Sequence, residues 1–251
     1  MANSELNAPA IDDSEEVSIK DGQIEEMFKA GVHFGYSRSH RHPKMSPYIY
    51  GIKNNVEFFD LEKVKIALLA AGDFIKKIGE SRRNILWVGT KPSIRNIVSK
   101  VAKDASSPYV AERWLGGTLT NAKVIRERLK YFEDLKKKQA SGELEKYTKK
   151  EQLEISREIS ALSRRLGGIE SLKNEIAAMV IVDPKEESTA LNEALKMKLP
   201  VIAIMSSDSD PSKIAYAIPA NDSSPTSVAL ILKSLAESYR KGVASSEVSA
   251  E

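Results

Sequence analysis

The sequence predicts an α/β fold, a parallel sheet whose chain is interrupted by an inserted helical hairpin. Short apolar runs of strand type alternate with helical patterns over 84–110 and again over 179–239, and such alternation is typical of parallel sheets. Between these stretches, residues 120–166 carry helical spacing and no strand pattern. A chain of 251 residues is long enough to bury a large core.

The first elements precede the sheet. Residues 23–29 predict a short helix that Gly31 ends. Residues 32–51 indicate an irregular polar loop, and a long loop of this kind is usually functional or disordered. Residues 56–59 predict a strand, and Asp60 is placed to cap the helix that follows.

The first half of the sheet follows a strand, helix, strand order. An amphipathic helix begins at Leu61, with apolar residues at steps of three and four up to Ile78. Residues 84–89 predict a buried strand, a helix opens near Pro92, and residues 109–110 predict the next strand. The two strands and the helix between them form a βαβ unit.

The second half repeats this order. Strands are expected at 179–183, 200–205 and, more weakly, 214–218, with a helix around 190–195. The last helix begins at Ser224 and Pro225, since serine caps helices and proline suits their first turn. The predicted domain parts are an acidic disordered leader (1–20), the sheet domain (21–118 and 167–240), the hairpin (119–166) and a disordered tail (241–251).

The hairpin is predicted from two apolar stripes around a polar turn. Stripes at such spacing let each helix bury the seam of the other, as in an antiparallel coiled coil. The stripe residues are Ile125, Leu129, Phe132 and Leu135 in the first helix, and Ile155, Ile159, Leu162 and Leu166 in the second.

Charge is distributed unevenly along the chain. The formal net charge is +3, yet residues 1–26 contain eight acids and one lysine, so the remaining residues carry +10. A basic body suggests a polyanionic partner. The chain has no cysteine and therefore no disulfide or thiolate metal site. No apolar run has the roughly 18 residues of a membrane helix, and the leader lacks the pattern of a targeting signal.

If the protein were an enzyme, its candidate catalytic or binding groups would lie only at the carboxyl ends of the strands. "VGTKPS" contains Lys91 but lacks the spacing of a Walker A loop, and no G-x-G-x-x-G occurs. A nucleotide- or phosphate-ester-binding enzyme using Gly89, Lys91 and Asp183 is the alternative hypothesis. Asp183, Asp208 and Asp210 could bind a hard cation, but turn and cap roles are favoured. No catalytic set, metal site or cofactor is predicted.

RNA binding is predicted from clusters that mix basic and aromatic residues. The loop after His33, itself expected to be packed, interleaves cations with tyrosines, and a second cluster surrounds Trp114. Such mixtures suit phosphate pairing and base contact in structured RNA. Trp114 is predicted to face RNA, with core packing as the alternative. The predicted RNA-binding residues are Arg38, His40, Arg41, His42, Lys44, Lys53, Lys91, Arg95, Arg113, Trp114, Asn121, Lys123 and Arg126.

Double glycines mark both crossings between the sheet and the hairpin. Gly116 and Gly117 precede the hairpin, and Gly167 and Gly168 follow it. Glycine tolerates sharp changes of direction, so both pairs are expected to form corners rather than phosphate cradles. Thr118 or Thr120 is available to cap the first hairpin helix.

Long segments of the chain resemble a known family. "HFGYSRSHRHPKMSPYIYG", "VGTKPS", "RWLGGTLTN", "VDP", "PVIAI" and "IPANDSS" are similar, in order, to the signature segments of the bacterial-type small-subunit ribosomal protein S-two family. The resemblance spans about residues 24–240. "MSSDSDP" departs from the family pattern, which weakens any cation site at Asp208 and Asp210.

The resemblance implies a fold and a role. The fold is flavodoxin-like, with helices on both faces of the sheet and a protruding coiled-coil hairpin. The role is a non-catalytic constituent of the small ribosomal subunit that contacts ribosomal RNA and neighbouring ribosomal proteins, including the mRNA-binding protein S-one. Such a protein is not a homo-oligomer and belongs to cytoplasmic ribosomes, although an organelle homologue would look similar.

Overall fold

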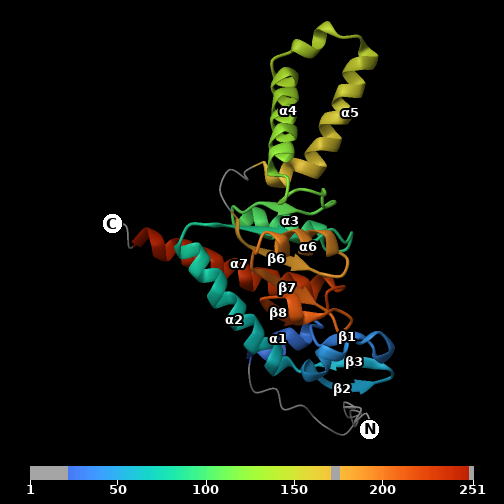
Figure 1. Ribbon diagram of the computed structural model, residues 1–251, viewed down its shortest axis with the longest axis vertical. Coiled ribbons are helices and arrows are strands. Elements are labelled where there is room, and N and C mark those ends of the chain that lie inside the picture. The colour runs from blue at the N-terminus through green and yellow to red at the C-terminus, as the bar shows by residue number, and fades with distance from the viewer. Residues whose placement is uncertain (1–21, 171–175, 249–251) are drawn as a thin grey trace.

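A computed structural model describes residues 22–170 and 176–248. The predicted acidic leader, residues 1–20, lies outside this range. Figure 1 shows an α/β body with a pair of helices that projects from one end and a small sheet at the other.

The main sheet has five strands in the order β5-β4-β6-β7-β8, and each neighbouring pair is parallel. Counted along the chain, this is the order 2-1-3-4-5 of flavodoxin-like, doubly wound sheets. The predicted parallel sheet is therefore confirmed. The strands are β4 (Asn84–Val88), β5 (Tyr109–Val110), β6 (Ile176–Val182), β7 (Val201–Met205) and β8 (Tyr216–Pro219).

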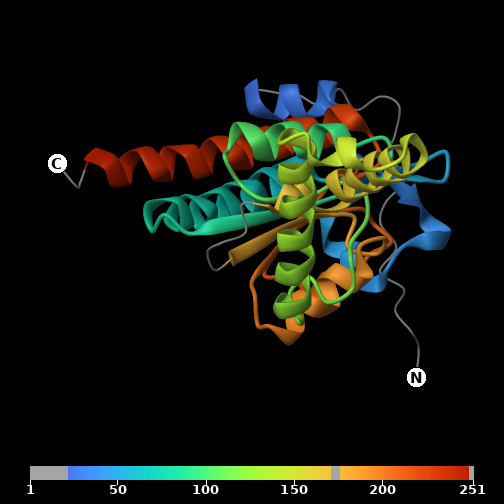
Figure 2. The same ribbon diagram turned by 90° about the horizontal axis from the view of Figure 1, so that it is seen from above.

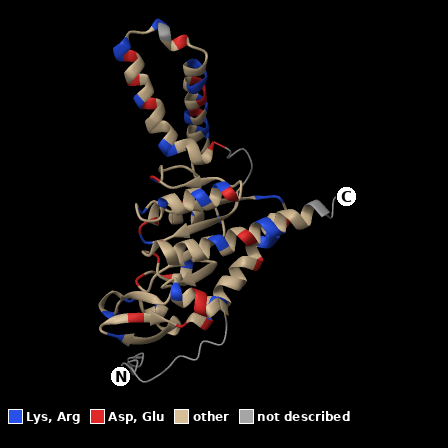
Figure 3. Ribbon diagram, turned by 180° about the vertical axis from the view of Figure 1, so that it is seen from behind, with Lys and Arg blue, Asp and Glu red and all other residues tan. Residues whose placement is uncertain are grey.

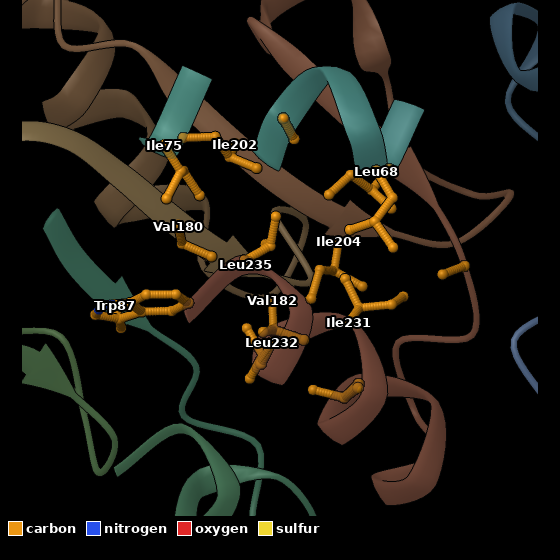
Figure 4. Close-up of a cluster of buried hydrophobic side chains, with 14 of the residues drawn as sticks. Leu68, Ile75, Trp87, Val180, Val182, Ile202, Ile204, Ile231, Leu232 and Leu235 are labelled. Atoms are coloured by element: carbon orange, nitrogen blue, oxygen red, sulfur yellow. The ribbon is translucent and has the colours of Figure 1, made fainter. Parts of the chain in front are cut away.

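The strands are apolar throughout because helices cover both faces of the sheet. Trp87, Val180 and Ile202 belong to the cluster against α2 (Leu61–Glu80), α3 (Arg95–Asp104) and α7 (Pro225–Val248), part of which Figure 4 shows. Leu86 and Met179, their alternating neighbours, belong to the second cluster, with α6 (Ser188–Lys196) and the base of the projecting helices. Alternate residues of each strand therefore face two different cores, as expected for a sheet buried on both sides.

The helix starts and stops follow the predicted local signals. Helix α1 (Gly22–Lys29) is followed by Gly31 at φ +73°, a backbone conformation that favours glycine. Asp60 accepts hydrogen bonds from the amides of Glu62 and Lys63 and so caps α2. Helix α3 begins at Arg95, later than Pro92, where the sequence predicts its opening.

The expectation of an irregular loop over residues 32–51 is wrong. The segment contributes β1 (Phe34–Ser37) and β2 (Ile49–Lys53), which pair on either side of β3 (Val56–Phe59) in an antiparallel sheet. Between them lie the 3-10 helices η1 (Arg38–His40) and η2 (Pro43–Tyr48). Both pairings contain register shifts, which disrupt the alternation that would reveal a strand in the sequence.

Two long helices form the inserted segment. Helix α4 (Ala122–Ala140) and helix α5 (Lys149–Leu166), with η3 (Glu143–Lys146) between them and η4 (Gly167–Ile169) after them, extend away from the sheet (Figure 1). Thr148 and Glu151 form a reciprocal capping box that starts α5. The predicted seam residues of α4 are all buried, and the α5 residues Ile159 and Leu166 join the same cluster.

The end of the chain differs from its predicted tail. Residues 241–248 are helical because α7 continues to Val248, and Figures 1 and 2 show α2 and α7 side by side. At Gly79 and Gly242 the two helices approach so closely that a Cβ on Gly242 would lie 2.1 Å from the carbonyl oxygen of Lys76. This close crossing lies within residues 241–248, whose small polar side chains predict no helix.

Candidate nucleic-acid interface

The base of the projecting helices is organised by a buried carboxylate, that of Glu193 on α6. Its Oε1 accepts hydrogen bonds from Trp114 Nε1 at 2.9 Å and from the Gly117 amide at 2.7 Å. Its Oε2 accepts from the amides of Leu119 at 3.0 Å and Thr120 at 3.2 Å, and from the Thr120 hydroxyl at 3.1 Å. The segment between β5 and α4 therefore folds around one charge.

The ionised form of Glu193 is the stable one. Burial acts to raise its pKa, but the hydrogen bonds from Trp114 and the backbone amides outweigh burial and lower the pKa below its usual value. Glu193 is a residue that sequence reasoning missed. It lies within an ordinary amphipathic helix, and no local signal distinguishes it from an exposed glutamate.

The prediction that Trp114 faces RNA is not met. The side chain is 8% exposed and packs in the second core cluster, and its indole N–H is used by Glu193. The hydroxyls of Thr118 and Thr120 are bonded to Leu115 and Glu193, so neither threonine caps α4. Of the two glycines, only Gly117 has a positive φ, +89°.

The other predicted residues at this base are on the surface. Arg113, Asn121, Lys123 and Arg126 are all exposed, and Asn121 directly precedes α4. Figure 3 shows basic positions along both projecting helices. The structure therefore brings four of the five predicted residues of this cluster together at the foot of α4.

The second predicted cluster lies on the small sheet. His40 is exposed, and its Nδ1 is 2.8 Å from the Ser37 hydroxyl. His42 is partly buried and its Nδ1 accepts from the Lys44 amide, so it caps η2. The Lys44 ammonium contacts the Ser212 hydroxyl and lies 3.6 Å from Asp210. Arg38, at the start of η1, and Lys53, at the end of β2, are both exposed.

Arg41 is largely withdrawn from this surface. Its guanidinium lies 3.4 Å from Glu57, whose side chain is 0% exposed, and Arg41 itself is 16% exposed. Burial raises the pKa of Glu57, while Arg41 acts to lower it. Arg41 therefore serves to neutralise a buried acid, Glu57, which lies on the neighbouring strand β3.

The crest of the main sheet, meaning the edge where the carboxyl ends of its strands lie, carries carboxylates and not a phosphate cradle. The side chain of Lys91 is 20% exposed, and its ammonium contacts Asp183 and lies 3.4 Å from Asp222. Glu187 is also buried there and accepts from the Thr90 amide at 2.6 Å. Two acids against one lysine disfavour an anionic ligand, which removes the geometric support for the phosphate-ester alternative.

The aspartates considered for a cation are paired or act in turns. Asp183 accepts from the amides of Lys185 and Glu186, Asp208 lies 2.7 Å from the Lys185 ammonium, and Asp210 accepts from the Ser212 amide. Within residues 22–170 and 176–248, no three His, Cys, Asp or Glu side chains are grouped to hold a metal ion.

The buried Asp222 makes a pH-dependent contribution to stability. Burial, and next the charge of Asp183, raise its pKa to about 6, with Lys91 acting in the opposite direction. A carboxyl whose pKa is raised on folding stabilises the protein below its unfolded pKa and loses that contribution as pH rises through the folded pKa.

We therefore expect Asp222→Asn to gain stability relative to wild type as pH rises from about 4 to about 7. Urea unfolding of both proteins across this range measures the difference. A difference in free energy of unfolding that stays constant with pH would show that Asp222 titrates normally.

Arg95, the last predicted residue, lies on α3. Its guanidinium is 3.3 Å from Glu112, and the two side chains are 42% and 38% exposed.

None of the helices within residues 22–170 and 176–248 has the length and apolar character that a membrane span needs.

Comparison with known proteins identifies the family. The family model described as "Ribosomal protein S2" matches residues 27–242. The small ribosomal subunit protein uS2 of Marinobacter nauticus is 37% identical over 214 residues, covering 85% of this chain and 86% of that protein. The proteins of the same name from Chlorobium phaeovibrioides and Spiroplasma citri are 40% and 41% identical over 86% of this chain, and the matches cover 84% and 60% of their lengths. Each of these relatives is named as a protein of the small ribosomal subunit. The chain therefore belongs to the ribosomal protein S2 family, as its motifs predict.

Proposed function

We propose that this protein is a structural constituent of the small ribosomal subunit, where it binds ribosomal RNA and supports translation. The family match over 27–242 carries this proposal, and the relatives are named as small-subunit proteins. A cytoplasmic ribosome is the proposed location, with one copy of the chain per subunit.

The proposed RNA surface has two parts. One is the foot of α4, with Arg113, Asn121, Lys123 and Arg126, and the other is the small sheet, with Arg38, His40, Lys44 and Lys53. The parts lie at opposite ends of the body (Figure 1). Exposed cations of this kind position a protein on the RNA backbone. Arg41 and Lys91 have buried carboxylate partners and contribute less.

An aromatic patch supports the docking of a neighbouring ribosomal protein, including protein S-one. Phe28 and Phe34 are 47% and 42% exposed, and their rings lie 4.4 Å and 4.2 Å from His33. Phe58 closes the group at 5.3 Å from Phe34. Exposed aromatic clusters are frequent anchors of protein interfaces.

The projecting pair is proposed to be an antiparallel coiled coil. The support is the burial of Ile125, Leu129, Phe132 and Leu135 on α4, with Ile155, Ile159, Leu162 and Leu166 partly or fully buried on α5. Lys136 pairs with Glu170 at 2.9 Å and so ties α4 to the segment after α5.

Co-sedimentation with the small subunit tests the function. We expect the tagged protein to run with small subunits in a low-salt gradient of cell lysate and to leave them after ribonuclease treatment. A protein that runs free under low-salt conditions would refute the proposal.

We expect Arg113→Ala with Arg126→Ala to weaken RNA binding. Losing two phosphate contacts should reduce the slope of log K against log salt by about 1.5 to 2. Lys233→Ala with Arg240→Ala, which removes two exposed charges from α7, is the matched control and should leave the slope near wild type. Equal slopes in all three proteins would assign Arg113 and Arg126 a structural role.

A further inference from the structure

A cleft of about 210 Å³ lies where the projecting helices return to the body. It is formed by α3, by β5 with the two residues after it, and by the end of α5 with Gly168. Its polar and charged lining comprises Arg95, Asn96, Ser99, Glu112, Ser163, Arg164 and Arg165. We propose that this cleft is a phosphate-binding pocket.

The fold brings the three arginines together through a close backbone contact. Gly168 passes so near β5 that a Cβ there would lie 2.2 Å from the carbonyl oxygen of Tyr109. This contact holds the last turn of α5, with Arg164 and Arg165, beside the edge of the sheet. Arg95 comes from the first turn of α3, on the other side of the cleft.

The charge of the cleft is unbalanced. Arg95 has a partner, Glu112, at 3.3 Å. Arg164 and Arg165 are exposed, and neither side chain has a hydrogen bond or ion pair with any residue that the structure describes. Three arginines against one glutamate leave a net charge of +2. The cleft thus differs from the crest, where Lys91 is neutralised by Asp183 and Asp222.

The donors suit a phosphate group. Guanidinium groups bind phosphate oxygens through paired, charge-assisted hydrogen bonds. The hydroxyl of Ser163 and the side-chain amide of Asn96 add neutral donors to the same walls, whereas the Ser99 hydroxyl donates to the Asn96 carbonyl. Tyr109 and Val110 supply an apolar side on which a sugar can rest.

The size of the cleft limits the ligand. Pockets that enclose a whole small molecule usually measure about 300–1,000 Å³, so a cleft of about 210 Å³ fits a phosphate with its attached sugar better than a complete cofactor. The phosphate can come from an RNA backbone or from a small phosphate ester. In its RNA form, this inference rests on the proposed function and adds a defined contact to it.

The experiment titrates the full chain with two probes in phosphate-free buffer. One probe is a short single-stranded RNA without terminal phosphates, and the other is adenosine 5′-monophosphate. NMR follows the side-chain Nε–Hε signals of Arg95, Arg164 and Arg165. We expect these signals to move with at least one probe, which identifies the source of the phosphate, whereas no movement with either probe overturns the pocket.

Variants separate a pocket from general charge. Arg164→Gln with Arg165→Gln should weaken binding of the active probe about tenfold, since it removes two charge-assisted contacts. Lys137→Gln with Lys138→Gln, which removes two exposed charges from the last turn of α4, should weaken it less than about twofold. Arg164→Lys with Arg165→Lys retains the charge and should still lose affinity, because lysine cannot bind bidentately.

Equal weakening by the two glutamine pairs would overturn the pocket. It would leave the proposed function intact, because co-sedimentation with the small subunit tests that function independently. Circular dichroism of each variant checks that the fold is retained, so a loss of binding can be assigned to the side chains.

Discussion

Replacing Glu193 with alanine is expected to destabilise the fold by about 4 kcal/mol, since each unsatisfied buried polar group costs about 1–3 kcal/mol. The change removes the acceptor of Trp114 Nε1, of three backbone amides and of the Thr120 hydroxyl. Water entering the vacated space can satisfy some of these donors but not all of them. The loss should therefore rank among the largest that a single substitution can cause in this chain.

Urea unfolding measures this loss, and Asn192→Ala is the control. Asn192 precedes Glu193 on α6 but is exposed, so its substitution should change the free energy of unfolding by less than about 0.5 kcal/mol. Glu193→Gln retains one acceptor oxygen but directs an amide donor at backbone donors, and it should lie between the two. A loss below about 1 kcal/mol for Glu193→Ala would show that the segment 113–121 keeps its fold without this carboxylate.

The pH dependence of this effect has the opposite sign to that of Asp222. The pKa of Glu193 is lowered on folding, so its stabilisation is present above the unfolded value of about 4.3 and is lost as pH falls through the folded pKa. The difference between wild type and Glu193→Ala should therefore shrink in acid. The pKa of Asp222 is raised, so wild type loses stability relative to Asp222→Asn as pH increases.

The main sheet could be predicted because its signals are local. Its strands are short apolar runs, and its helices begin at recognisable caps such as Asp60. The small sheet could not be predicted, since β1 and β2 are held by pairing with β3 and contain irregular registers. Helix α7 extends past its expected end because of a contact with α2, which no pattern in residues 241–248 encodes.

The candidate site could be predicted only in part, for a similar reason. Composition identifies cations, but it does not identify which of them meet a buried acid. Arg113 and Arg126 are on the surface, whereas Arg41 is held by Glu57 and Lys91 by Asp183. Asp183 lies far from Lys91 in the chain, and Glu57 lies on β3, a strand whose pairing beside Arg41 the sequence pattern does not reveal.

The double glycines show the same limit at finer scale. The sequence marks Gly116-Gly117 and Gly167-Gly168 as corners, but it does not say which member of each pair is required. In the first pair, Gly117 has a positive φ and Gly116 has open space around its Cα. In the second pair, the requirement is steric, and it depends on a strand that lies far away in the sequence.

Gly168→Ala is expected to destabilise the protein by about 3 kcal/mol, the upper part of the range for overpacking. The added Cβ would lie 2.2 Å from the Tyr109 carbonyl oxygen and 2.9 Å from its ring carbons. Backbone cannot yield as a flexible side chain does, so η4 must move away from β5. Gly168 also lines the cleft that contains Arg95, Arg164 and Arg165, so the same change should weaken phosphate binding there.

Gly167→Ala is the matched control for this substitution. Gly167 has right-handed helical angles, φ −57° and ψ −31°, and a Cβ there would meet nothing closer than 3.7 Å. Alanine in such a position is neutral or stabilises by about 0.4–1 kcal/mol, because it restricts the unfolded chain. The midpoint of thermal unfolding should therefore fall for Gly168→Ala and stay unchanged or rise for Gly167→Ala. If both alanines lowered the midpoint equally, the corner would need the flexibility of its two glycines, and the close contact of Gly168 with β5 would not explain the pair.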